Sequence, residues 1–171
     1  MARPIIAPWQ FTIRSLLLAL GLVAIACVAL LNANRWWASG CSTGSFALLT
    51  AAILLAVHGD SQRRAYWLGF AVAGWVYVLL HGMAVLGLSN LLITAEVLDV
   101  LYPLFPWQEP PGDLSLAFAQ GGTMTAAEVM HRNSFDEVGH ALFALLAALL
   151  GGTLSQWLFH RRQLRLPGEA L

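Results

Sequence analysis

The chain contains 171 residues, of which 58% are hydrophobic and only 11% are charged. Soluble domains carry roughly 25% charged residues, so this composition excludes an ordinary water-soluble protein and predicts apolar side chains that face lipid. The nine basic residues are all arginine, and they balance nine acidic residues to zero net charge. The chain therefore has no overall electrostatic attraction for nucleic acid.

Four apolar segments approach the roughly 20 residues that a helix needs to cross the hydrocarbon core of a membrane. They are residues 11–31, 36–58, 66–88 and 138–159. We therefore expect an all-α fold, a single integral membrane domain over residues 1–171 that forms a four-transmembrane-helix bundle. The second segment is the least apolar because serine, threonine and cysteine fill its first turns. Such hydroxyl groups can bond to helix carbonyls or to a neighbouring helix.

The arginines give an orientation. Short connections at residues 32–35 and 59–65 make the first three segments antiparallel neighbours. Only Arg35 and Arg132 then fall on one side, and seven arginines fall on the other: Arg3, Arg14, Arg63, Arg64, Arg161, Arg162 and Arg165. By the positive-inside rule the arginine-rich side is cytoplasmic, which predicts a protein of the cell (inner) membrane with both termini in the cytoplasm.

The first segment also has features of a cleaved signal peptide. An arginine precedes it, and the small-residue sequence Ala24-Ile-Ala26-Cys27 loosely resembles a lipoprotein cleavage box. However, the apolar run continues to Leu31 and exceeds the 7 to 15 residues usual for a signal core. We expect a retained span, with cleavage as the alternative.

The long connection, residues 89–133, is expected to form an extracytoplasmic lid with helical pieces. Residues 90–102 have helical apolar spacing and are stopped by Pro103 and Pro106, which predicts a helix along the outer interface. Residues 107–112 and 120–122 have the composition of turns, and residues 123–132 predict a short helix.

Two stretches carry a resemblance to a known group. The opening Gln10-Phe-Thr-Ile-Arg-Ser-Leu-Leu17 resembles the Arg-Phe-Ser-Leu-Arg-Thr-Leu-Leu type of opening common in planctomycete-type membrane proteins. The run from Gly139 to Gly152 is similar to the last helix of small multi-pass proteins of that group. The resemblance implies a membrane protein and assigns no functional residue.

The pattern Glu-Val-x-His occurs twice, as Glu128 to His131 and Glu137 to His140. A carboxylate and an imidazole at this spacing share a helix face, so these four residues are a candidate metal site. The same stretch also contains two capping boxes, Thr125-x-x-Glu128 and Ser134-x-x-Glu137, which predict two helices joined by a tight turn at residues 132–134. We favour capping, since one continuous helix would turn the two pairs to opposite faces. His131 would then be a solvated residue at a helix end.

His140 is predicted to point into the bundle, because it begins a face of small residues suited to close helix contact: Ala144, Ala147, Ala148, Gly151, Gly152 and Ser155. His81 lies about as far from the outer end of the third segment, so both imidazoles come within roughly one helical turn in depth. Ionisable residues inside a membrane are functional candidates, which makes His81 and His140 the main candidate site.

Three roles suit this pair. It could ligate haem b as the cofactor, with His58 and His160 as a conceivable second pair at the inner ends. It could instead relay protons or bind a polar substrate. In the third role, the two imidazoles are neutral, bond to hydroxyl or backbone partners and hold two helices together. The third role is the one we expect.

Sequence motifs for other enzyme classes are missing: the chain has no Gly-x-Ser-x-Gly, no phosphate-binding glycine loop and no lysine. The leading expectation is an accessory or structural interaction protein of the cell envelope, in contact with the lipid bilayer and with a membrane protein or a second copy. The alternative is a redox or proton-handling protein that uses His81 and His140, and no catalytic residue is assigned.

Overall fold

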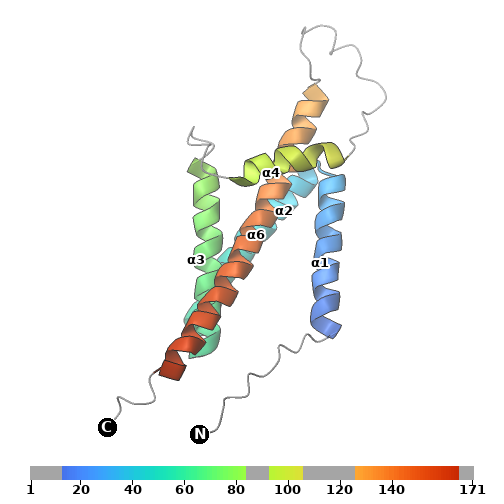
Figure 1. Ribbon diagram of the computed structural model, residues 1–171. Coiled ribbons are helices and arrows are strands. Elements are labelled where there is room, and N and C mark those ends of the chain that lie inside the picture. The colour runs from blue at the N-terminus through green and yellow to red at the C-terminus, as the bar shows by residue number, and fades with distance from the viewer. Residues whose placement is uncertain (1–12, 84–92, 106–125, 166–171) are drawn as a thin grey trace, which may run out of the picture.

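The computed structural model describes residues 13–83, 93–105 and 126–165, and within these ranges every regular element is a helix (Figure 1). The elements are α1 (Ile13–Leu31), α2 (Arg35–His58), α3 (Ser61–Met83), α4 (Ile93–Leu101), the 3-10 helix η3 (Tyr102–Leu104) and α6 (Ala126–Arg165). The predicted all-α fold is confirmed. The predicted turns at 107–112 and 120–122 lie outside the described residues.

Among the described residues, three helices are long and apolar enough to cross a membrane. Their spans are Arg35–His58, Arg63–Met83 and Glu128–Arg162, with mean hydropathies of 1.8, 1.3 and 1.7. In α1, the apolar stretch Leu20–Leu31 is shorter. Large hydrophobic side chains are exposed on all four of these helices, as expected where lipid replaces water. The chain is therefore a helical membrane protein.

The polar start of α2 is accommodated by local hydrogen bonds. Asn34 caps the helix, because its side-chain oxygen accepts from the backbone N–H groups of Trp36 and Trp37, both at 3.0 Å. The hydroxyls of Ser45 and Thr50 each donate to the carbonyl four residues earlier, at 2.8 Å. Lipid offers these polar groups no hydrogen-bond partner, so the bonds within the helix satisfy them. The predicted second helix is confirmed.

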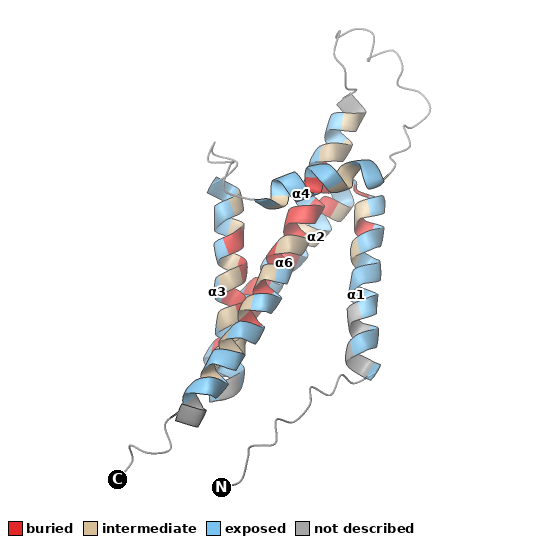
Figure 2. Ribbon diagram, viewed as in Figure 1, coloured by how far each residue is buried: buried red, intermediate tan, exposed pale blue. Residues whose placement is uncertain are grey.

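The predicted small-residue face of α6 packs against α3. Ala144 and Ala148 are 2% and 0% exposed, and Figure 2 shows the buried positions following one side of α6. A Cβ added at Gly69 would overlap the backbone carbonyl of Gly151, and one added at Gly151 would overlap Ala73. The backbones of the two helices are therefore close enough to exclude a side chain at either glycine.

The expected pair of capped helices at residues 123–159 is wrong, because the structure has a single helix, α6, of 40 residues. Ser134 lies within it and is buried, and Phe135 is fully buried against the rings of Tyr102 and Phe105. Residues 132–134 contain neither proline nor glycine, so this packing keeps the helix continuous where the capping pattern predicts a turn. The last helix thus begins at residue 126 instead of 138, and the predicted 89–133 lid ends earlier.

At a rise of 1.5 Å per residue, α6 is roughly 60 Å long, about twice the thickness of the hydrocarbon core. The N-terminal part of α6 contacts α4, which crosses α6 in Figure 1. Leu98 of α4 is buried over Gly139, where a Cβ would overlap it, and Asp99 pairs with Arg132 of α6 at 2.6 Å. A helix predicted within residues 90–102 is therefore found at Ile93–Leu101, held against the N-terminal part of α6, and its position along the membrane interface stays a prediction.

Helix α1 joins the bundle only at its outer end. Ala29 packs with Ala38 of α2 and Val138 of α6, and Ala33 lies with Leu98 and Phe135. The described residues between 13 and 25 are all exposed, and Figure 1 shows this end diverging from α6. Tertiary contacts thus hold α1 at one end. The rest of its described surface is exposed and can contact lipid or another protein.

The α3–α6 contact predicts a specific sensitivity to side-chain size. Gly151→Leu forces side-chain atoms into Ala73 and the Gly69 carbonyl, so it should lower the free energy of unfolding by at least about 1–3 kcal/mol. Thermal unfolding in detergent, followed by circular dichroism, measures this loss. Gly44→Leu is the control, since a Cβ there meets no atom within 4 Å. Equal stability of the two variants would contradict the proposed close contact.

Candidate functional site

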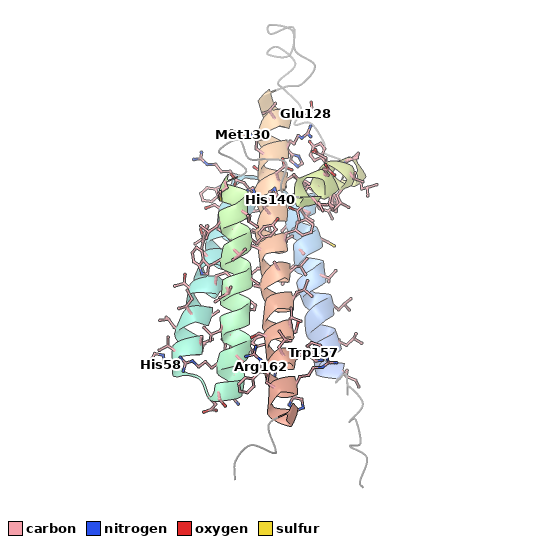
Figure 3. All side chains as sticks on the ribbon, turned by 60° about the vertical axis from the view of Figure 1, so that its left-hand side comes forward. His58, Glu128, Met130, His140, Trp157 and Arg162 are labelled. Atoms are coloured by element: carbon pink, nitrogen blue, oxygen red, sulfur yellow. The ribbon has the colours of Figure 1, made fainter. Side chains whose placement is uncertain are left out.

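The structure brings the predicted histidine pair together. The imidazole rings of His81 on α3 and His140 on α6 are stacked, with centroids 3.8 Å apart and planes inclined by 29°. His140 is only 9% exposed, and Figure 3 places it near the outer end of the bundle, far from Trp157 and Arg162. The small-residue seam positions the pair, because it sets how closely α3 and α6 approach.

Tyr77 and Thr94 extend the site and were not predicted from the sequence. The Tyr77 hydroxyl lies 2.9 Å from His140 Nδ1 and 3.0 Å from Thr94 Oγ1 on α4. A sequence signal existed for Tyr77, because it precedes His81 by four residues and so shares its helix face. No local signal pointed to Thr94, which reaches the site only because α4 folds back over α6.

These hydrogen bonds can run in either direction. A hydroxyl donates one hydrogen, so Tyr77 donates to His140 when Nδ1 is unprotonated and then accepts from Thr94. When His140 Nδ1 carries a hydrogen, it donates to Tyr77, and Tyr77 donates to Thr94. The chain Thr94–Tyr77–His140 therefore accommodates both forms of the imidazole without losing a bond.

A cavity of about 90 Å³ adjoins the stacked rings between α2, α3 and α6. At about 30 Å³ per molecule in the liquid, this is space for a few waters or one small polar group. Glu137 is exposed and is the carboxylate among the lining residues. The lining residues are Ser42, Ser45, Phe46, Tyr77, Val78, His81, Glu137, His140, Ala141 and Ala144.

One polar atom at this cavity has no protein partner. His81 Nδ1 is buried and makes no hydrogen bond with the described residues, as is also true of the indole nitrogen of Trp75. Leaving such a group unpaired costs about 1–3 kcal/mol. The expectation that both histidines bond to hydroxyl or backbone groups holds for His140 and fails for His81 Nδ1.

An apolar layer lies on one side of the site. Leu49, Phe70 and Ala148 form a buried cluster together with Ala52 and Ala71. A Cβ added at Gly74 would overlap Leu49, which shows how tightly this layer is packed. The histidine pair therefore has a tightly packed apolar layer between it and the Gly69–Gly151 contact.

The candidate metal residues are not gathered into one site. Since α6 is continuous, the nine residues between the two Glu-Val-x-His copies correspond to about 900° of rotation, which turns the pairs to opposite faces. Glu137 and His140 belong to the cavity, whereas Glu128 and His131 lie near η3. Across the described ranges, no group of three or more His, Cys, Asp or Glu side chains is placed to hold a metal.

His131 is half-buried, so its expected position as a solvated helix-end residue is wrong. Its Nδ1 lies 3.5 Å from the Tyr102 hydroxyl, whose ring also contacts the Arg132 guanidinium at 5.7 Å. Burial raises the pKa of Tyr102, and the carboxylates of Glu128 and Asp136 raise it further against the opposing effect of Arg132. The phenol therefore stays neutral and can donate or accept in this contact, which helps to fasten η3 to α6.

The geometry does not suit haem b. Two axial imidazoles bind iron from opposite faces of the macrocycle, with a nitrogen of each directed at the metal. Rings stacked at 3.8 Å leave no space for a macrocycle between them. His58 and His160 do not offer a second buried pair either, because both are exposed and His58 Nδ1 already bonds to the Leu54 carbonyl at 2.9 Å.

Comparisons with protein-family models, curated proteins and solved structures found no match for this chain. The resemblance to planctomycete-type membrane proteins therefore stays a prediction. The function must be inferred from the cavity and the side chains that line it.

Tyr77→Phe tests the hydrogen-bond chain. The substitution leaves His140 Nδ1 and Thr94 Oγ1 without their shared partner, so we expect a loss of about 1–3 kcal/mol in the free energy of unfolding. Tyr66→Phe on the same helix is the matched control, because the Tyr66 hydroxyl forms no hydrogen bond with the described residues. If both variants unfold at the wild-type temperature, Tyr77 is not a structural link between α4 and His140.

Proposed function

We propose that this chain is a four-span protein of the cell (inner) membrane whose His81/His140 pair binds protons from the outer side. The topology follows from the arginines at one end of the bundle. In Figure 3, His58, Trp157 and Arg162 lie near one end, and Glu128 and Met130 lie at the other. The guanidinium of Arg161 stacks over the Trp157 ring at 3.9 Å, as suits an interfacial pair. This end is the cytoplasmic one, and α1 is the fourth span.

The stacked His81/His140 pair beside a cavity is the observation that carries the proposal. An imidazole is the side chain suited to gaining and losing a proton near neutral pH, and both rings line a cavity with space for water. Glu137 on α6 also lines this cavity, and Tyr77 on α3 can exchange its hydrogen-bond direction with His140. Ser42 and Ser45 are the polar groups that α2 contributes to the lining, and neither is charged.

The buried apolar cluster beside the histidines limits where a bound proton can move. Leu49, Phe70 and Ala148 leave no hydrogen-bonded route toward the cytoplasmic end among the described residues. Protons that enter beside Glu137 therefore return to the same side. The site suits a protein that responds to the acidity outside the membrane, and it does not suit a proton conductor.

Nitrogen-15 NMR of histidine-labelled protein in lipid nanodiscs tests this proposal. Two stacked imidazoles interact strongly, so we expect His81 and His140 to take up protons in two coupled steps as the pH falls from 8 to 4. His140→Phe should convert the His81 titration into a single step, because the stacked partner no longer titrates. His58→Phe, at the cytoplasmic end, should leave both steps unchanged. The proposal fails if both rings stay neutral throughout.

A second function, as an interaction protein of the envelope, is favoured by α1. Leu16, Leu20 and Ile25 are each at least 60% exposed, and the described residues around them are exposed on every side of the helix. Helix α1 contacts its own bundle at one end. Another membrane protein or a second copy of this chain can cover the exposed remainder of the helix.

In-cell photocrosslinking distinguishes this function. A photoreactive residue at Leu20 should give one discrete adduct if α1 has a defined partner. The same residue at Leu79 on α3, exposed to a similar degree, is the control for random collisions in the membrane. Identical adduct patterns at the two positions, or none, would argue that only lipid covers α1.

A further inference from the structure

Two exposed rows of apolar side chains each end in an arginine. Residues four apart are neighbours on one face of a helix, so steps of four trace a continuous row. The two rows are Leu150, Leu154, Leu158 and Arg162 on α6, and Val76, Val72, Leu68 and Arg64 on α3. Their six apolar side chains are between 45% and 70% exposed, and both arginines are exposed as well. Each row is therefore an apolar strip with a positive charge at one end.

The two rows lie on the same side of the α3–α6 pair. A Cβ at Gly69 would overlap Ser155, so these two residues face each other across the contact. Leu68 precedes Gly69 by one residue and Leu154 precedes Ser155 by one residue, which turns each side chain about 100° from the contact. In antiparallel helices that face each other, equal turns lead to the same side. Phe70, one residue after Gly69, lies on the other side, where it packs in the buried cluster with α2.

The arginines of the two rows lie at nearly the same depth. Arg64 precedes Gly69 by five residues and Arg162 follows Ser155 by seven, which places them about 7.5 and 10.5 Å from the contact along the helices. Figure 3 shows Arg162 at the end of the bundle where Trp157 also lies. From Leu150 to Leu158 the α6 row is about 12 Å long, which fits within the roughly 15 Å of hydrocarbon in one leaflet.

The positive charge at this end is not balanced by the described residues. The described charged side chains of the two helices and their connection at this end are four arginines and one carboxylate: Arg63, Arg64, Arg161, Arg162 and Asp60. Arg64 and Arg162 form no ion pair or hydrogen bond within the described part of the chain. Arg161 stacks over the Trp157 ring, which also leaves its charge without an anion. A negatively charged partner is therefore the complement of this end.

We propose that the side of α3 and α6 bordered by the two rows binds an anionic phospholipid. Its phosphate lies at Arg64 and Arg162, and its acyl chains lie along the two rows. A guanidinium presents its N–H donors in a fork that matches the oxygens of a phosphate. Basic residues at a membrane surface are attracted to anionic lipids, and apolar side chains next to them give the acyl chains a surface to pack on.

Other occupants suit this surface less well. A second copy of the chain related by a twofold axis along the membrane normal would place Arg64 and Arg162 against the same arginines of its partner, and like charges repel. A soluble anion can pair with the guanidinium groups, but it leaves the apolar rows uncovered. A phospholipid supplies both the negative charge and the apolar chains.

This inference does not depend on the proposed function. It requires only that α3 and α6 lie in a membrane, and it uses none of the side chains that line the histidine cavity. Lipid binding and histidine titration can therefore succeed or fail separately.

The test is native mass spectrometry of the full-length protein in detergent with an equimolar mixture of dioleoyl-phosphatidylglycerol and dioleoyl-phosphatidylcholine. The two lipids have the same acyl chains, and only the first has a net negative charge. We expect the protein to retain phosphatidylglycerol in preference, and Arg64→Gln and Arg162→Gln each to lower the affinity for it about 5-fold. Arg63→Gln is the matched control, because it removes an equal charge from a neighbouring residue outside both rows, and it should bind like the wild type.

Glycerol 3-phosphate, the soluble part of the head group, distinguishes a lipid site from a site for any phosphate. We expect it to leave the phosphatidylglycerol adduct in place when both are present at equal concentration. The proposal is overturned if the two lipids bind equally, if Arg63→Gln lowers the affinity as much as the two row variants do, or if glycerol 3-phosphate displaces the lipid at equal concentration.

Discussion

The close approach of α3 to α6 at Gly69 and Gly151 determines the geometry of the site. A Cβ at either glycine would overlap the backbone of the opposite helix, so the two helices meet at main-chain distance. His81 follows Gly69 by 12 residues and His140 precedes Gly151 by 11, which places them about 18 and 16.5 Å from the contact along antiparallel axes. The imidazoles therefore stack at one level because the glycines define both the distance and the register of the helices.

A membrane interior makes each polar group costly unless it is paired, and several of the polar side chains described within these helices are paired. The hydroxyls of Ser45 and Thr50 return to carbonyls of their own helix, and Tyr77 bonds to both His140 and Thr94. Against this background, an unpaired nitrogen on His81 beside a cavity is informative. The proton site that we propose uses the His81 and His140 imidazoles and the nearby carboxylate of Glu137.

The N-terminal part of α6 connects this site to α4 and η3. Three contacts hold η3 and α4 against α6. The ring of Phe135 packs on Tyr102 of η3, Arg132 pairs with Asp99 of α4, and Leu98 of α4 packs over Gly139. The same α4 supplies Thr94 to Tyr77, so its position and the hydrogen bonds of His140 are linked.

Composition and apolar periodicity alone determined that this is an all-helical membrane protein, and the spacing of small residues identified the face of α6 that carries His140. The equal depths of His81 and His140 also followed from counting residues along straight helices. Local patterns failed at residues 132–134, where a capping box predicted a turn but the burial of Phe135 under η3 keeps α6 continuous. Thr94, the cavity and the unpaired His81 nitrogen were decided only by tertiary structure, because they depend on how separate helices pack, which no local sequence pattern records.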